Sequence, residues 1–142
     1  MLKQLAFTLL LMTAGAASAD STLVISDAWI RYIPGDRPMA GYFVLKNNGE
    51  ESRNLVGAAS PAFGEVQLHR SMTLNGVVSM SPVDSVSLPA HGQAAFSPGG
   101  YHLMMKYPTR ELKVGDTPQV SLKFGDGYIL KTSFTVKPAW QE

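Results

Sequence analysis

The sequence predicts an all-β fold, either a Greek-key sandwich or a small β-barrel. Short runs rich in Val, Ile, Leu, Phe and Tyr follow one another along the chain, and Gly, Pro, Asn and Asp separate them at close intervals. A helical spacing of apolar residues over a useful length is absent. Many short strands joined by close turns are typical of two packed sheets or of one closed sheet.

Turn residues bound each of the predicted strands. The clearest turns are Pro34-Gly35-Asp36, Asn47-Asn48-Gly49, Asn75-Gly76, Pro98-Gly99-Gly100 and Gly125-Asp126-Gly127. In chain order the predicted strands are Thr22–Ser26, Ala28–Ile33, Gly41–Asn47, Arg53–Ala59, Glu65–Met72, Gly76–Val83, Ser85–Leu88, Gln93–Phe96, Tyr101–Lys106, Gln119–Phe124 and Tyr128–Val136.

Residues 1–19 carry the three parts of a secretory signal peptide. Lys3 supplies a positive start, Leu5–Met12 an apolar run too short to span a bilayer, and Ala17-Ser18-Ala19 a small-residue cleavage site. A buried N-terminal helix is the alternative interpretation. We therefore expect residues 20–142 to form one soluble periplasmic domain without a membrane span. Because no cysteine precedes the cleavage point, we expect no lipid anchor.

Charge and composition exclude several classes of function. The chain has 12 Lys and Arg against 11 Asp and Glu, and removal of Lys3 makes these numbers equal. Such a balance gives no electrostatic footprint for nucleic acid or for an anionic membrane. The absence of cysteine excludes a disulfide framework, a thiolate nucleophile, an iron–sulfur cluster and a blue-copper centre. The sequence shows no catalytic triad in a recognisable context, no pair of catalytic carboxylates and no phosphate-binding loop. It therefore gives no indication of an enzyme.

The segment Glu65–Val83 predicts a β-hairpin that brings a histidine close to a methionine. Asn75-Gly76 between two apolar-rich runs is the strongest short-range hairpin signal. With a two-residue or a four-residue loop, His69 and Met80 share a face as diagonal neighbours about 7–8 Å apart, and Met72 points to the other face, towards the core. A three-residue loop would separate His69 from Met80. The predicted cross-strand pairs are Leu74 with Val77, Ser71 with Met80, and His69 with Pro82.

The strand that begins at Tyr101 predicts a second pair of the same kind. Because strand side chains alternate between faces, His102, Met104 and Lys106 share one face. The opposite face, which we expect to be core, holds Tyr101, Leu103, Met105 and Tyr107.

The two pairs together supply two imidazole nitrogens and two thioether sulfurs, in a site that we expect at the surface. Soft thioethers favour Cu(I) over zinc, calcium or magnesium. Protonation of the two histidines, near or below about pH 6.5, would weaken binding. Each residue alone also fits an ordinary role, since methionine commonly fills β-sheet cores. A metal-free periplasmic β-sandwich that binds a protein partner is therefore the alternative.

The order His69, ten residues, Met80, twenty-one residues, His102-x-Met104 resembles the H-x10-M-x21-H-x-M motif of the periplasmic copper chaperones called PCuAC. The resemblance implies a cupredoxin-like β-barrel that binds one Cu(I) through these four side chains. It extends over most of the mature chain, through Asp27-Ala28-Trp29-Ile30-Arg31, Gly41-Tyr42-Phe43, Lys46-Asn47-Asn48-Gly49, Leu68-His69, Asn75-Gly76-Val77-Val78-Ser79-Met80, Pro98-Gly99-Gly100-Tyr101-His102-Leu103-Met104 and Leu122-Lys123-Phe124.

We expect a carrier and not an enzyme, and nothing in the sequence requires more than a monomer. The resemblance implies delivery of copper to an acceptor. Copper would pass by ligand exchange towards the binuclear copper site of cytochrome c oxidase, with oxidase subunit II or another assembly chaperone as the accepting partner. Copper storage or resistance through the same site is the alternative role.

Three further residues bear on this site. Members of the PCuAC family often carry an acidic residue or a further His or Met just after the first histidine, whereas Arg70-Ser71-Met72 stands here, so Met72 is a weak candidate for an additional ligand. Met39, which follows Pro38 in a predicted loop, is a weak candidate to line the site. His91 lies in a turn context and is expected to be a solvated loop residue.

Overall fold

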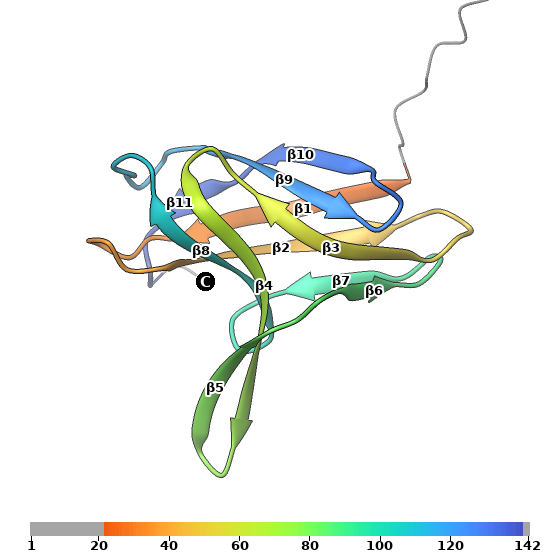
Figure 1. Ribbon diagram of the computed structural model, residues 1–142, viewed down its shortest axis with the longest axis horizontal. Coiled ribbons are helices and arrows are strands. Elements are labelled where there is room, and N and C mark those ends of the chain that lie inside the picture. Colours follow the sequence, from red (N-terminus) through yellow and green to blue (C-terminus); the bar gives the residue numbers. More distant parts are fainter. Residues whose placement is uncertain (1–21, 141–142) are drawn as a thin grey trace, which may run out of the picture.

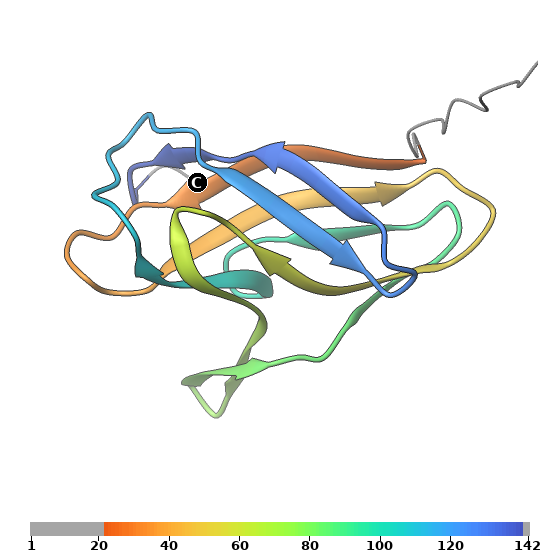
Figure 2. The ribbon, with the colours of Figure 1, turned by 45° about the horizontal axis from the view of Figure 1, so that its top comes forward.

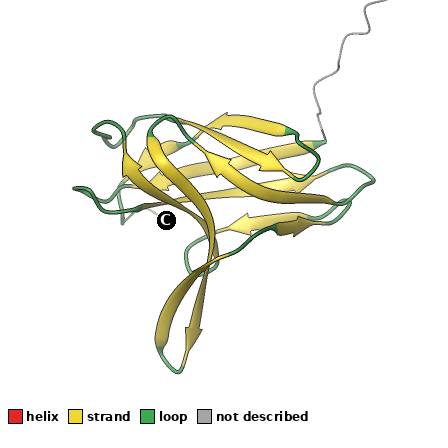
Figure 3. Ribbon diagram, viewed as in Figure 1, coloured by secondary structure: helices red, strands yellow, loops and turns green. Residues whose placement is uncertain are grey.

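The computed structural model describes residues 22–140, which form strands and loops without a helix (Figures 1 and 3). Residues 1–19, the predicted signal peptide, lie outside the described range. Within that range no helix long and apolar enough to cross a membrane occurs. The strands are β1 (Leu23–Arg31), β2 (Met39–Asn47), β3 (Arg53–Ala59), β4 (Phe63–Leu74), β5 (Val77–Pro82), β6 (Val86–Leu88), β7 (Gln93–Phe96), β8 (Tyr101–Pro108), β9 (Gln119–Phe124), β10 (Ile129–Ser133) and β11 (Thr135–Lys137).

The strands make two sheets that enclose the core (Figure 2). The larger sheet has the order β11-β1-β2-β7-β8-β4-β5, with an additional pairing of β2 with β8, and the smaller has the order β10-β9-β3-β6. Most neighbours run antiparallel, but β11 lies parallel to β1. The prediction of an all-β sandwich is therefore confirmed.

Two predicted strand boundaries are wrong. The predicted strands Thr22–Ser26 and Ala28–Ile33 form one strand, β1, because a bulge between Ser26 and Trp29 absorbs the irregularity, with Asp27 at a φ of 53°. The predicted strand Tyr128–Val136 is broken at Phe134, which is fully buried. On one side of this break β10 pairs with β9 in the smaller sheet, and on the other β11 pairs with β1 in the larger.

An aromatic cluster anchors the core between the sheets. The ring of Phe43 stacks on Phe96 with centroids 4.3 Å apart and meets the edge of Phe134 at 5.6 Å. Such ring pairs contribute about 0.5–1.5 kcal/mol beyond the area that they bury. Around this cluster pack buried aliphatic side chains from both sheets, including Ile30, Leu45, Leu55, Leu88, Leu103, Val120 and Leu122.

The outer half of the β4–β5 hairpin, residues 71–81, extends away from the sandwich, and we call it the arm (Figure 1). Up to Arg70, β4 is paired with β8, whereas beyond that residue β5 is its only neighbour. Met72 is consequently 56% exposed, and the expectation that it points into the core is wrong. Among residues 22–140, β5 is the only strand that pairs with this part of β4, and Met72 is left exposed.

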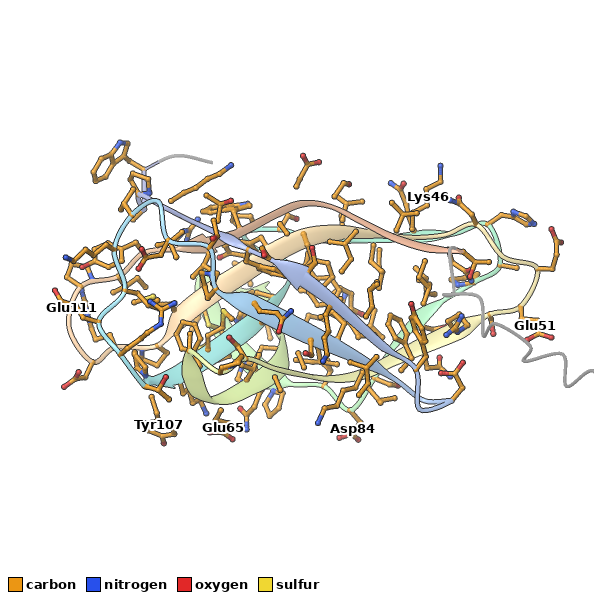
Figure 4. All side chains as sticks on the ribbon, turned by 90° about the horizontal axis from the view of Figure 1, so that it is seen from above. Lys46, Glu51, Glu65, Asp84, Tyr107 and Glu111 are labelled. Carbon is orange, nitrogen blue, oxygen red and sulfur yellow. The ribbon has the colours of Figure 1, made fainter. Side chains whose placement is uncertain are left out.

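The core face predicted for the strand 101–107 is correct at its centre and wrong at its end. Leu103 and Met105 are fully buried and Tyr101 is half-buried. Tyr107 is 68% exposed at a φ of 56° and points away from the sandwich (Figure 4). The left-handed backbone at this position breaks the alternation on which the prediction rests.

Candidate metal site

Three adjacent strands carry the four predicted ligands. In the larger sheet β4 lies between β8 and β5, so His69 on β4 has His102 and Met104 on one side and Met80 on the other. Residues separated by about 11, 33 and 35 positions along the chain are therefore neighbours only because of this strand order.

The pairing register puts the four side chains on one face of the sheet. His69 lies directly opposite His102 across β4 and β8. Ser71 lies directly opposite Met80, as the hairpin prediction required. Direct partners share a face, and so do residues two apart on one strand. Hence Met80 shares the face of His69, and Met104 that of His102.

The distances agree with this arrangement. The ring centroids of His69 and His102 are 5.6 Å apart with the planes inclined at 52°. Met80, His102 and Met104 line one cavity of about 260 Å³ between the arm and the ends of β1 and β2. Ala40, directly opposite Met104 across β2 and β8, also lines the cavity and contributes only a methyl group to its wall.

The nitrogen and sulfur sides of the site differ in burial. His69 is 8% exposed and His102 is 3% exposed, while Met80 on the arm is 55% exposed. Met104 is half-buried. The prediction of a surface site is therefore correct for the sulfur of the arm, but the two imidazoles lie beneath the surface.

Each histidine has one ring nitrogen in a polar contact and one without. His69 Nε2 lies 2.9 Å from Gln67 Oε1, and His102 Nδ1 lies 3.4 Å from the Gly100 carbonyl oxygen. Among the described residues, His69 Nδ1 and His102 Nε2 are buried without a hydrogen-bond partner. Leaving a buried polar atom unpaired costs about 1–3 kcal/mol. A metal ion bound by both of these nitrogens would satisfy them, so their presence in one site is consistent with a metal site.

Burial holds both imidazoles in the neutral form that binds metals. The pKa of His69 is lowered, mainly by desolvation. The neighbouring His102 and Lys106 lower this pKa further, whereas Glu65 raises it. Desolvation also lowers the pKa of His102, although the contact with the Gly100 carbonyl raises it in part. At neutral pH both rings therefore offer a lone pair.

A polar network lies beside His69 on the same sheet face. Gln67 Oε1, which contacts His69, also accepts a hydrogen bond from Lys106 Nζ at 3.1 Å, and Gln67 Nε2 donates to Glu65 Oε1 at 2.6 Å. Glu65 and Lys106 are direct cross-strand partners, with Nζ 3.9 Å from Oε2. Gln67 belongs to no motif in the sequence, and its position two residues before His69, which puts it on the same face, is the one signal that points to it.

Of the other three candidates, Met39 borders the cavity, as predicted, whereas Met72 and His91 lie outside it. Met72 is the neighbour of Ser71 on β4, so it points to the face opposite Met80. Met39 is in β2 and not in a loop; its partner is Met105, and both are buried on the core side, from which Met39 borders the cavity. His91 is exposed in a turn and contacts Glu50 at 2.8 Å, as expected for a solvated residue.

The donor set itself restricts the metal. Among residues 22–140 no group of three or more His, Cys, Asp or Glu side chains is arranged to hold a metal ion. The side chains that share the sheet face of His69 and His102 include the thioethers of Met80 and Met104, and imidazole with thioether is a combination that suits a soft monovalent ion.

A family model and a relative both match most of this chain. The family model described as "Putative lipoprotein LpqE-like" matches residues 23–136. The relative named "Putative lipoprotein Lxx21020", from Leifsonia xyli subsp. xyli, is 32% identical over 114 residues, which cover 80% of this chain and 68% of that protein.

Solved structures with the same architecture include copper-bound proteins. The solution structure of CuI-DR1885 from Deinococcus radiodurans is 34% identical, with a TM-score of 0.66 over 87% of this chain and 83% of that one. The copper-bound PCuAC domain from PmoF2 has a TM-score of 0.69 and covers 85% of this chain and 97% of its own; at 21% identity it bears on the fold alone.

Fold and site define the class of protein: an all-β, cupredoxin-like domain with a histidine and methionine cluster on one edge of its larger sheet. The chain belongs to the LpqE-like family.

Proposed function

We propose that this protein is an exported copper chaperone that binds one Cu(I) through His69, Met80, His102 and Met104. The observation that carries the proposal is the pair of buried ring nitrogens without partners, on the sheet face that also holds two thioethers. The similarity to a protein solved with Cu(I), at 34% identity over most of both chains, supports the same metal.

The ligand set suits a carrier and not a catalyst. Neutral imidazole and thioether donors bring no negative charge, so they hold a soft monovalent ion without the strong attraction that a thiolate would add. Met80 is exposed on the arm, and the cavity beside it offers an incoming ligand a path. Exchange would begin by replacement of Met80, and the buried histidines would release the ion last.

The proposed acceptor is the binuclear copper site of cytochrome c oxidase, reached through oxidase subunit II or another assembly chaperone. Export to the periplasm, through cleavage of residues 1–19, would place the carrier in the same compartment as that site. The names of the family and of the relative from Leifsonia xyli, both called lipoproteins, support export.

Copper binding is tested by anaerobic mass spectrometry of residues 20–142 with Cu(I). We expect one copper per chain. Under a competing Cu(I) chelator, His69→Ala and Met104→Leu should each lose roughly tenfold or more in affinity, since even partners of metal ligands contribute that much. Met72→Leu is the matched control, because Met72 is on the same hairpin but on its other face. Wild-type affinity in both ligand variants would refute the site.

A further inference from the structure

We infer that Gln67 is a positioning residue that fixes the proton of His69 on Nε2 and so directs Nδ1 towards the metal, while His102 binds through Nε2. This inference rests on the proposed copper site, and it concerns which atom of each ring makes the bond.

The orientation of the Gln67 amide follows from its two charged neighbours. Lys106 Nζ can only donate, so the Gln67 atom 3.1 Å from it must be the carbonyl oxygen. The Glu65 carboxylate can only accept, so the Gln67 atom 2.6 Å from it must be the amide nitrogen. Turning the amide over would put two donors together at Lys106 and two acceptors together at Glu65.

The tautomer of His69 follows from the orientation of that amide. Gln67 Oε1 can only accept, and it lies 2.9 Å from His69 Nε2, so Nε2 carries the hydrogen. The lone pair is then on Nδ1, which is the ring atom that is buried without a partner. Metal-binding histidines are commonly oriented in this way by an acceptor on the other ring nitrogen.

His102 has the opposite arrangement. Its Nδ1 faces the Gly100 carbonyl oxygen at 3.4 Å, and a carbonyl only accepts, so the hydrogen is on Nδ1. The lone pair is on Nε2, the second buried nitrogen without a partner. The two facing rings therefore present one δ and one ε nitrogen, each the atom left free by its own acceptor.

A charge exchange between Glu65 and Lys106 tests the inference. In the double variant Glu65→Lys, Lys106→Glu the cross-strand pair and the net charge are kept, but the Gln67 amide should turn over and donate to His69 Nε2. We expect ¹⁵N spectra of the metal-free protein to show the hydrogen on Nε2 of His69 in the wild type and on Nδ1 in the variant. Cu(I) affinity should fall roughly 10- to 100-fold.

A second pair of variants covers the case in which the exchanged protein folds poorly. The double variant Glu65→Gln, Gln67→Glu keeps an acceptor for both His69 and Lys106, keeps the net charge and lets the new amide at position 65 donate to the new carboxylate at position 67, so it should retain affinity within roughly threefold. The double variant Glu65→Gln, Gln67→Leu removes the acceptor and should lose roughly tenfold or more. Thermal unfolding of both variants controls for structural damage.

The metal-free spectra separate this inference from the copper proposal. A wild-type spectrum with the hydrogen on Nδ1 of His69, or an exchanged variant with an unchanged tautomer, would overturn the role of Gln67 even if copper binds. Expected spectra without any Cu(I) binding would instead refute the copper site. Equal affinity in the two double variants, Glu65→Gln, Gln67→Glu and Glu65→Gln, Gln67→Leu, would also overturn the role of Gln67.

Discussion

At the scale of single residues, the site is built from groups that reduce the stability of the metal-free protein. His69 and His102 are buried, and each leaves one ring nitrogen without a hydrogen bond among the described residues. An apolar side chain of similar size would avoid this cost of about 1–3 kcal/mol per nitrogen. Binding of a metal ion to both nitrogens would recover it, which couples binding to stability.

The lowered pKa values of His69 and His102 predict how the stability of the metal-free protein depends on pH. Below the ordinary histidine pKa of about 6.5, the unfolded chain binds protons that the folded chain still excludes, so the free energy of unfolding falls as the pH falls. Urea unfolding from about pH 7.5 to about pH 5.5 measures this decline.

The double variant His69→Gln, His102→Gln is the control for that decline. Since glutamine does not titrate, the free energy of unfolding of the double variant should change less over the same range. Equal pH dependence in both proteins would show that the two imidazoles are not the cause. For the same reason, the lowered pKa values should let the wild type keep its copper below pH 6.5.

At the scale of the strands, the site lies where β4 passes from a strand with two neighbours to a strand with one. His69, paired with both His102 and Pro82, is on the two-sided part of β4, whereas Met80 lies opposite Ser71 beyond it. The imidazoles are therefore held by the body of the larger sheet, and Met80 is held only by the hairpin. In the proposed carrier, this difference would allow Met80 to be displaced without disturbance of the two imidazoles.

The turn at Asn75-Gly76 decides whether Met80 faces the site. Both residues have positive φ, 51° and 76°, as a two-residue hairpin turn requires. Insertion of one glycine between them should shift the pairing by one residue and turn Met80 to the other face. We expect Cu(I) affinity to fall to the value of Met80→Leu, measured by competition with a chelator.

Insertion of two glycines at the same point is the matched control. A four-residue loop returns Met80 to the face of His69, so affinity should recover most of the wild-type value. Circular dichroism establishes that both proteins keep their strands. If the single insertion bound copper as tightly as the wild type, Met80 would not be a ligand.

At the scale of the whole molecule, the core and the site occupy different parts of the sandwich. The cluster of Phe43, Phe96 and Phe134 is in the interior between the sheets. The cavity of the site lies between the arm and the ends of β1 and β2. Stability of the domain and affinity for copper should therefore respond to different substitutions.

Phe43→Ala should cost about 3–5 kcal/mol in the free energy of unfolding, because it opens a cavity beneath two aromatic rings. That is a large part of the roughly 5–15 kcal/mol typical of a domain. Urea unfolding measures the loss, and Val114→Ala, at a residue 51% exposed, should change stability by less than about 0.5 kcal/mol.

Copper affinity of the folded Phe43→Ala protein should remain near the wild-type value. A variant that lost affinity and stability in proportion would show that core and site are one cooperative unit, contrary to the separation described above.

Local patterns were sufficient for the pairing of the hairpin. The Asn-Gly turn and the alternation of strand side chains correctly predicted that Ser71 lies opposite Met80 and that Met104 shares the face of His102. These are properties of neighbouring residues, and the strand period of two fixes them without reference to the rest of the chain.

The sequence by itself determined the all-β class and which side chains share a face of the β4–β5 hairpin and of the centre of β8, because turn residues and alternation act over a few residues. Only the tertiary structure decided which faces are covered, since a partner strand far along the chain has to reach them. For that reason Met72 is exposed on the arm, the imidazoles are buried, and Gln67 lies between Glu65 and Lys106 beside His69.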